Sequence, residues 1–392
     1  MGGAVTGSWH LITGEYPPQG GGVADYTALV ARALAAAGAD VHVWAPPAPA
    51  GASAAVANGV HVHRLPDLFG EGALRELTRG LDGTVGPRTL VVQYVPHAFG
   101  ARGMNLRFCR WVQHRARTAR DDVRVMFHEP YYPFAFWPLH RNILALVNRI
   151  MAVLLLSDSR IAYVSTRAWQ RRLARYAPRA RRFVWLPIPA SIPLVRDAAR
   201  VAAWRTRIAP QAGSRVVGHF GTYGALVARL LEPALALLLQ QHADLLLCLI
   251  GPGSEAFASR LCANHADWRE RITAAGRLSA PEVSACLQAC DVVVQPYADG
   301  ASGRRTTLMA ALINEVPVVT NRGRATEVEW TEGDAVALAP RAHPQAICDT
   351  AWRVIEDDAL RGRLAQGGAS LYARRFAVTH TVHALLAGQG AP

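Results

Sequence analysis

Short apolar runs rich in β-branched residues alternate with helical stretches along almost the whole chain. A strand covered on both faces appears as a continuous apolar run, and a turn and a helix then carry the chain back to the same edge of the sheet. The alternation therefore predicts an α/β protein with doubly wound parallel sheets. In the first half we expect strands at 9–13, 40–45, 60–65, 89–95, 123–128, 160–165 and 182–186, with helices between them, for example at 23–37 and 104–119.

A second series of strands begins near residue 215 and is expected at 215–220, 245–250, 272–275, 292–295, 317–320 and 335–338. Between the two series, Pro187, Pro189 and Pro193 exclude a helix or a central strand, so this stretch is the expected linker. We predict a first Rossmann-like domain at 1–190 and a second at 191–375, which ends in a helical stretch at 343–376. The remaining tail, 376–392, is expected to be helical and to return towards the first domain. Two such domains would face each other across a cleft at the carboxyl ends of their strands.

Length and composition agree with this division. The 392 residues suit two cores, and 51% hydrophobic with 18% charged residues is typical of a folded globular chain. The net charge of +13 comes entirely from arginine, because the sequence contains no lysine. Such a charge favours anionic partners without choosing among nucleic acid, lipid and phosphorylated substrates. The six cysteines show no metal or disulfide spacing.

The N-terminus shows no basic segment followed by an apolar run, so we expect a cytoplasmic protein. The longest apolar stretch, 143–156, is interrupted by Asn148 and Arg149 and is too short to span a bilayer. We expect a buried or surface-lying helix there.

The first motif, at 13–26, follows the first strand and contains three consecutive glycines. Gly21 and Gly22 would allow a ligand to approach the backbone, and the following helix start offers amides to an anion or a sugar oxygen. A flexible connection without a ligand is the alternative.

The second motif, at 127–132, places His128 and Glu129 at the end of the fifth predicted strand, beside Tyr131. A histidine and a carboxylate among aromatic residues can bind sugar hydroxyls. A purely structural histidine is the alternative interpretation.

Two glycine-containing turns follow strands of the second domain. Gly221 and Thr222 come after its first strand, with Arg229 in the next helix, and Gly251 follows its second strand. We expect the glycines to allow a phosphate to approach and Arg229 to reach a diphosphate.

The most informative motif is at 291–312, where a buried strand ends in a small-residue loop that opens a helix. Loop amides, a helix N-terminus and guanidinium groups together suit a diphosphate, and Asp299 could accept bonds from sugar hydroxyls. A solvated arginine pair is the alternative. The expected donor-binding residues of this motif are Ser302, Gly303, Arg304, Arg305, Thr306 and Thr307.

With these motifs in this order, the chain resembles the family 4 (group 1-type) glycosyltransferases of the GT-B fold. The resemblance implies retaining transfer of a hexose from a nucleotide-diphosphate sugar, without a metal or a cofactor, to a glycan, a lipid-linked sugar or a small molecule. It implies a donor held mainly by the second domain, with Gly21 and Gly22 of the first domain near its phosphates and sugar. His128 and Asp299 would be the catalytic residues near the transferred sugar. The acceptor would contact Glu15, Tyr16, Asp25, Glu129 and Tyr131 in the first domain.

The sequence departs from the family pattern at two places. Thr307 replaces the second glutamate of the family's paired-glutamate motif, which usually grips the ribose. The family's arginine and lysine after the first strand of the second domain become Thr222 and, at best, Arg229. We therefore predict that Arg304 and Arg305 supply the missing positive charge to the diphosphate.

The stretch 102–120 carries six arginines interleaved with Leu106, Phe108, Trp111 and Val112. Such a helix could lie on an anionic membrane at the inner face and meet a lipid-linked acceptor, or it could be an ordinary solvated helix.

Three other functions are weighed against glycosyl transfer. A catalytically impaired sugar-nucleotide-binding or scaffold member of the same fold would explain the lost ribose glutamate. An epimerase acting on a nucleotide sugar would need a cluster of carboxylate bases that the sequence lacks. Nucleic-acid binding is suggested by charge alone, without a recognition motif, and is not expected.

Overall fold

The computed structural model describes residues 7–48, 56–137, 141–178, 181–211, 213–263 and 265–388. The chain divides into two compact units, Met1–Pro187 with Val378–Pro392, and Ile188–Ala377. The first boundary lies inside the proline-rich stretch, which forms neither helix nor strand. Each unit has its own sheet and its own core.

The first unit is built on a parallel sheet in the order β3-β4-β2-β1-β5-β6-β7-β8, with only β3 antiparallel. Its strands are β1 (Ser8–Thr13), β2 (Asp40–Ala45), β3 (Val56–Ala57), β4 (Val60–Arg64), β5 (Arg88–Tyr94), β6 (Asp122–Phe127), β7 (Ile161–Val164) and β8 (Arg182–Trp185). The short β3 is absent from the sequence-based expectation because two residues give no alternation to detect.

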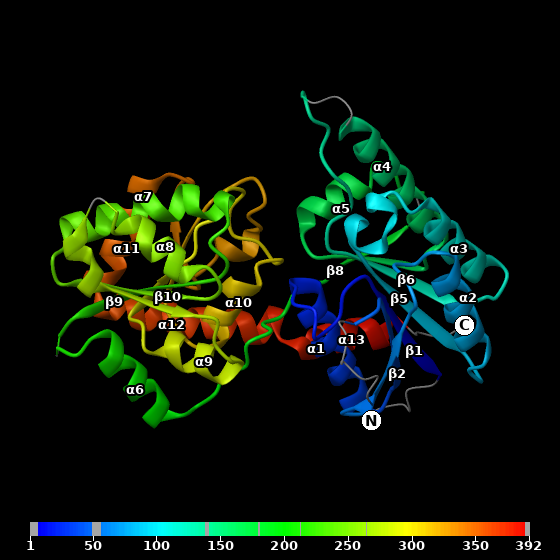
Figure 1. Ribbon diagram of the computed structural model, residues 1–392, viewed down its shortest axis with the longest axis horizontal. Coiled ribbons are helices and arrows are strands. Elements are labelled where there is room, and N and C mark those ends of the chain that lie inside the picture. Colours follow the sequence, from blue (N-terminus) through cyan, green and yellow to red (C-terminus); the bar gives the residue numbers. More distant parts are fainter. Residues whose placement is uncertain are drawn as a thin grey trace. The chain divides into compact units, whose positions relative to one another are not determined.

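Helices cover both faces of this sheet (Figure 1). The core of one face is formed with α2 (Glu71–Asp82), α3 (Leu106–Arg117), α4 (Arg141–Asp158) and α5 (Arg167–Leu173). On the other side, α1 (Gly22–Ala36) packs against α13 (Val378–Ala387). The short segments η1 (Pro96–Phe99) and η2 (Ala101–Gly103) join β5 to α3.

The second unit has a parallel sheet in the order β11-β10-β9-β12-β13-β14. Its strands are β9 (Arg215–Phe220), β10 (Leu245–Ile250), β11 (Ile272–Gly276), β12 (Val292–Val294), β13 (Val318–Asn321) and β14 (Ala337–Ala339). The order reverses between β9 and β12, which neighbour each other in the sheet although two strands separate them in sequence. Ligands of open α/β sheets bind at such a reversal, outside the carboxyl ends of the strands.

The core of one face of this sheet includes α7 (Ala225–Gln241), α8 (Ser254–Leu261) and α11 (Pro344–Glu356), as Figure 1 shows. The remaining elements are α6 (Ala198–Ile208), η3 (Ala266–Arg271), α9 (Ala280–Gln288), α10 (Thr306–Ile313), η4 (Val328–Trp330), α12 (Asp358–Leu371) and η5 (Tyr372–Phe376). The helical stretch predicted at 343–376 is interrupted at Asp357, whose side chain accepts a hydrogen bond from the Leu360 amide and caps α12. Of the predicted tail, residues 389–392 lie outside the described part of the chain.

The fold class predicted from the sequence is confirmed: both units are doubly wound parallel α/β structures. The apolar stretch at 143–156 forms most of α4, with Ala152 and Leu155 buried and Ile143 and Leu146 exposed. In the described part of the chain, no helix is both long and apolar enough to cross a membrane.

Candidate functional site

A polar pocket lies in the second unit where the strand order reverses. It encloses about 200 Å³ next to the carboxyl ends of β9 and β12 and the N-terminus of α10. The first amides of a helix have no intrahelical partner, so this end of α10 favours an anion. The pocket is lined by His219, Phe220, Gly221, Thr222, Val227, Gln295, Tyr297, Arg304, Arg305, Thr306 and Thr307.

The two arginines of the pocket share one carboxylate. Asp299 is 2.7 Å from Arg304 and also pairs with Arg305, whose guanidinium lies 4.3 Å from the centre of the Tyr297 ring. Burial alone would raise the pKa of Asp299, but the two positive charges outweigh it and hold that pKa below the usual value. Asp299 therefore stays ionised and neutralises about half of the arginine charge.

The loop before α10 is held by the protein itself. The Gly303 amide donates to Glu327 at 2.9 Å, and its carbonyl accepts from the Ile188 amide at 2.7 Å. Ser302 is fully buried. Gly303 thus has both backbone groups engaged within the protein, and neither Ser302 nor Gly303, which were expected to bind the donor, is among the residues that line the pocket.

Glu327 has a role that the sequence analysis missed. It is nearly buried and accepts from both the Gly303 amide and the Trp330 indole. A single glutamate in a polar stretch resembles a surface residue in sequence, so no local pattern signals this role.

Gly251 also has a structural role. A side chain there would lie 2.2 Å from the Gly221 carbonyl oxygen, and the Gly251 amide donates to Gly276. The glycine lets two loops pack backbone to backbone, and it does not line the pocket. Gly221 and Thr222 do line the pocket.

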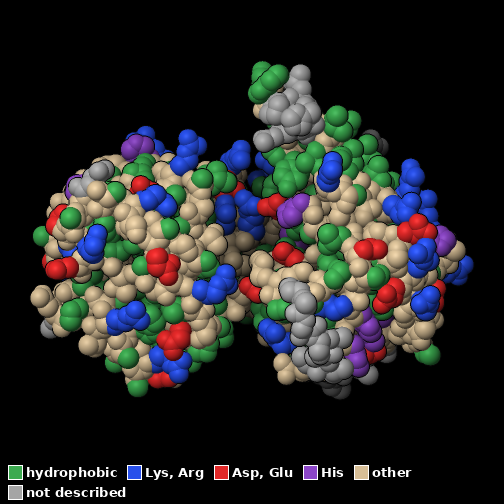
Figure 2. All heavy atoms as spheres, viewed as in Figure 1, with side chains coloured by type: hydrophobic (Ala, Val, Ile, Leu, Met, Phe, Trp, Pro, Cys, Tyr) green, Lys and Arg blue, Asp and Glu red, His purple; other side chains and the backbone are tan. Residues whose placement is uncertain are grey.

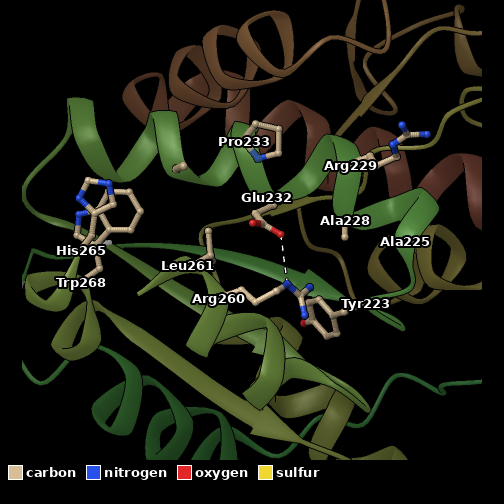
Figure 3. Close-up of a pocket in the computed structure, with 11 residues that line it drawn as sticks. Tyr223, Ala225, Ala228, Arg229, Glu232, Pro233, Arg260, Leu261, His265 and Trp268 are labelled. Atoms are coloured by element: carbon tan, nitrogen blue, oxygen red, sulfur yellow. Dashed lines mark hydrogen bonds and ion pairs between the residues drawn. The ribbon is translucent and has the colours of Figure 1, made fainter. Parts of the chain in front are cut away.

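Arg229 lies outside the polar pocket. It lines a separate surface groove of about 720 Å³ between α7 and α8, together with the Glu232–Arg260 ion pair (Figure 3). Val227 faces the polar pocket, and two residues along a helix turn the side chain by roughly 200°. Arg229 is therefore not among the residues that line the polar pocket.

In the first unit, Glu15 occupies the start of α1. Its carboxylate accepts from the Val23 amide at 3.2 Å, and a side chain on Gly21 would meet it at 2.6 Å. The helix start that was expected to receive a ligand thus already holds an anion. Gly22 has open space around its α-carbon, and Asp25, on the first turn, is exposed.

Tyr16 is buried, with the Arg64 guanidinium 5.5 Å from the centre of its ring. Glu129 is exposed, and Tyr131 is half-buried against Arg149 and Tyr176. Of these three residues, Glu129 is the one with an exposed side chain, and it lies just after β6.

His128 lies at the end of β6, as predicted, and is nearly buried. Its Nε2 is 2.9 Å from the Gln93 side-chain oxygen, and its ring meets Tyr26 edge-on. Burial lowers the pKa of His128 to about 3. The ring is therefore neutral near pH 7 and acts as a hydrogen-bonding group rather than a proton acceptor.

The sequence of the second unit matches the family model for group 1 glycosyl transferases over residues 215–357. This segment contains every residue that lines the polar pocket. No curated protein matches the chain.

Solved structures match nearly the full length. The sucrose-phosphate synthase of Thermosynechococcus elongatus is 15% identical with a TM-score of 0.74, over 96% of this chain and 97% of that one. Anabaena HepE, solved with UDP and glucose, is 15% identical with a TM-score of 0.68, over 97% and 98%. WaaG, a glycosyltransferase involved in lipopolysaccharide biosynthesis, is 15% identical with a TM-score of 0.65, over 98% and 100%.

The fold is that of the GT-B glycosyltransferases. The family match in the second unit and the GT-B fold together indicate a glycosyltransferase.

Proposed function

We propose that this GT-B protein transfers a hexose from a nucleotide-diphosphate sugar to a glycan, a lipid-linked sugar or a small molecule, as a retaining, metal-independent family 4 enzyme. The polar pocket carries the proposal. Two arginines and a helix N-terminus meet at a strand-order reversal, within the segment that matches the group 1 family. Anabaena HepE, a structural neighbour, was solved with UDP and glucose, which supports the choice of donor class.

In this proposal the second unit stabilises the leaving group. Negative charge grows on the diphosphate as its bond to the sugar breaks, and groups already aimed at that charge lower the barrier. Arg304, Arg305 and the first amides of α10 are those groups. The departing phosphate itself takes the proton of the acceptor, so a neutral His128 is compatible with the reaction.

The donor site is tested by nucleotide binding. We expect Arg304→Gln/Arg305→Gln to weaken UDP binding at least tenfold in calorimetry, since a charge-assisted hydrogen bond contributes about 1.5–3 kcal/mol. Arg229→Gln is the matched control, because it removes an arginine of the neighbouring groove and should leave the affinity unchanged. The triple variant that adds Asp299→Asn removes the uncompensated carboxylate, and UDP binding equal to that of the unaltered protein would refute the arginine roles.

Turnover separates this function from a sugar-binding or scaffold protein. The protein should release nucleoside diphosphate from a nucleotide sugar in the presence of EDTA, and NMR of the product should show the anomeric configuration of the donor. Nucleotide binding without any turnover across an acceptor panel would favour the scaffold alternative.

We also propose contact with an anionic membrane, through a different surface from the one expected. The described residues of α3 expose no large apolar side chain, since Phe108 and Val112 are buried, although Arg110 is exposed. The loop after β6 and helix α4 instead expose a set of apolar side chains, which we term the aromatic surface: Tyr132, Phe134, Phe136, Trp137, Ile143, Leu146 and Ile150.

The aromatic surface has the chemistry of a bilayer interface. Phe136 is fully exposed and Trp137 is 81% exposed, and hydrophobic side chains gather over α4 in Figure 2. Burial raises the pKa of neighbouring Tyr131, and the positive charges of Arg149, Arg172 and Arg175 oppose that rise. Residues 130–157 include no carboxylate. Apolar and aromatic groups beside arginines favour anionic lipid.

Vesicle sedimentation tests this contact. The protein should bind phosphatidylglycerol vesicles more than phosphatidylcholine vesicles, and less at high salt. Phe136→Ser/Trp137→Ser should reduce binding at least tenfold, because burying one such side chain contributes about 1.5–3 kcal/mol. Leu68→Ser, at another exposed apolar position of the same unit, is the control. If Phe136→Ser/Trp137→Ser leaves vesicle binding unchanged but alters the oligomeric state, a second copy of the chain covers this surface instead of a membrane.

A further inference from the structure

His219 presents an unused hydrogen-bond acceptor to the polar pocket. The residue lies on β9, is 2% exposed and lines the pocket. Its Nδ1 is 2.8 Å from the Val294 carbonyl oxygen. A carbonyl oxygen can only accept, so Nδ1 carries the hydrogen, and in the neutral ring Nε2 keeps its lone pair.

The ring is neutral because it is buried. Burial lowers the pKa of His219 to about 4, although the bond to Val294 opposes that shift. Within the part of the chain that the structure describes, Nε2 has no hydrogen-bond partner. A buried polar atom without a partner is rare in folded proteins and calls for an explanation, such as a ligand group that completes it.

Gly221 keeps open the space that Nε2 faces. A side chain on Gly221 would lie 3.6 Å from Nε2 and 3.6 Å from the Thr307 methyl group, so the two side chains border the same space. The Thr307 hydroxyl already bonds to the Tyr297 hydroxyl at 2.9 Å. The family resemblance places a ribose-binding glutamate at position 307, and threonine lacks its carboxylate.

We propose that His219 Nε2 accepts a hydrogen bond from a ribose hydroxyl of the donor nucleotide and so replaces the missing glutamate. This inference rests on the proposed donor-binding function. An ionised phosphate oxygen is excluded as the partner, because it and the unprotonated Nε2 are both hydrogen-bond acceptors and neither carries a hydrogen to donate. The charged groups of the pocket, Arg304 and Arg305 with Asp299, provide no hydrogen for Nε2.

Two substitutions separate the two ring nitrogens. The amide nitrogen of His219→Asn can replace Nδ1 and keep the bond to Val294, but the variant has no acceptor at the position of Nε2. The longer His219→Gln can place its amide oxygen near Nε2. His219→Asn should therefore lose affinity, and His219→Gln should retain most of it.

The experiment measures binding of UDP, GDP and ADP, with their 2′-deoxy and 3′-deoxy forms, by calorimetry at pH 7.5. His219→Asn should weaken binding of the best ribonucleotide about tenfold. For the analogue that lacks the contacted hydroxyl, the variant and the unaltered protein should bind equally. Thermal unfolding of each variant checks that it is folded.

The remaining outcomes contradict one proposal or the other. If the unaltered protein binds none of the nucleotides, the proposed function fails. If nucleotides bind but His219→Asn weakens ribose and deoxyribose forms equally, or not at all, the ribose contact is wrong. Affinity that rises steeply as the pH falls below 7 would also overturn it, because a protonated ring would then be contacting phosphate.

Discussion

Gly300 directly follows Asp299, the carboxylate that pairs with both arginines of the polar pocket. Its φ is +91°, and a side chain there would lie 2.3 Å from the Thr326 hydroxyl and 2.4 Å from the Gly323 amide nitrogen. We expect Gly300→Ala to lower the free energy of unfolding by at least about 2 kcal/mol, because alanine is strained at positive φ and the close backbone approach leaves no room.

Gly362 provides the matched control within the same unit. It lies inside α12 with no atom within 4 Å of the added side chain. Gly362→Ala should raise stability by up to about 1 kcal/mol, since alanine is the better helix former. Chemical unfolding followed by circular dichroism measures both changes, and an unchanged stability of Gly300→Ala would contradict the packing described at Gly300.

At the residue scale, the sequence predicts which stretch forms the pocket but not which side chains reach it. Arg304, Arg305 and Thr307 line the pocket because they follow a buried strand and open a helix. Arg229 does not line the pocket, because the direction of its side chain depends on how α7 is rotated about its axis, and the sequence does not show that rotation. His219 was overlooked because a histidine inside an apolar strand resembles any other core residue until its hydrogen bonds are known.

At the scale of elements, β1, β2 and β4 carry a histidine stack that makes the first unit sensitive to acid. His10 stacks on His42 at 4.8 Å, and His42 bonds to His63 at 2.9 Å. The Trp44 indole donates to His10 Nδ1, so the bond needs a neutral ring. Burial, then the neighbouring positive groups, lower the pKa of His10 to about 3.

This pKa gives the direction of the pH effect. Because the folded pKa lies below the unfolded value of about 6.5, the contribution of His10 is complete above pH 6.5 and is lost as the pH falls towards 3. Between pH 7.5 and 5.0 the loss is about 2 kcal/mol. His10→Gln should be less stable than the unaltered protein at pH 7.5. Between pH 7.5 and 5.0, however, its free energy of unfolding should fall by about 2 kcal/mol less than that of the unaltered protein. Urea unfolding at both pH values measures this, and equal pH dependence would show that His10 is not responsible.

The strands were more predictable than their ends or the breaks between helices. Predicted and observed strands coincide at Asp40–Ala45, Arg215–Phe220 and Leu245–Ile250, each of which is followed directly by a proline or a glycine. The break at Asp357 depends on one capping bond, and the pairing of β3 depends on a partner strand. Such features come from contacts and are not visible as periodicity.

At the scale of the whole molecule, the first unit contains two segments that lie far apart in the sequence, one before and one after the second unit. Helix α13 packs on α1 and belongs to the first unit, although all of 188–377 forms the second. Arg124 of β6 is fully buried and donates to the Leu385 carbonyl, while the Tyr163 hydroxyl donates to Ala384 at 3.3 Å. The last helix therefore completes the core around the first sheet.

This arrangement predicts that a change in α13 destabilises the first unit and spares the second. Leu385 is 2% exposed, so Leu385→Ala should lower stability by about 2–5 kcal/mol through lost burial and a cavity. Hydrogen exchange should show reduced protection in β6 and α1 and unchanged protection in β9 and β10. Leu371→Ala, on α12 of the second unit, is the matched substitution and should give the reverse pattern. Equal loss of protection in both units after either change would mean that the two units unfold as one, and that α13 does not belong to the first unit alone.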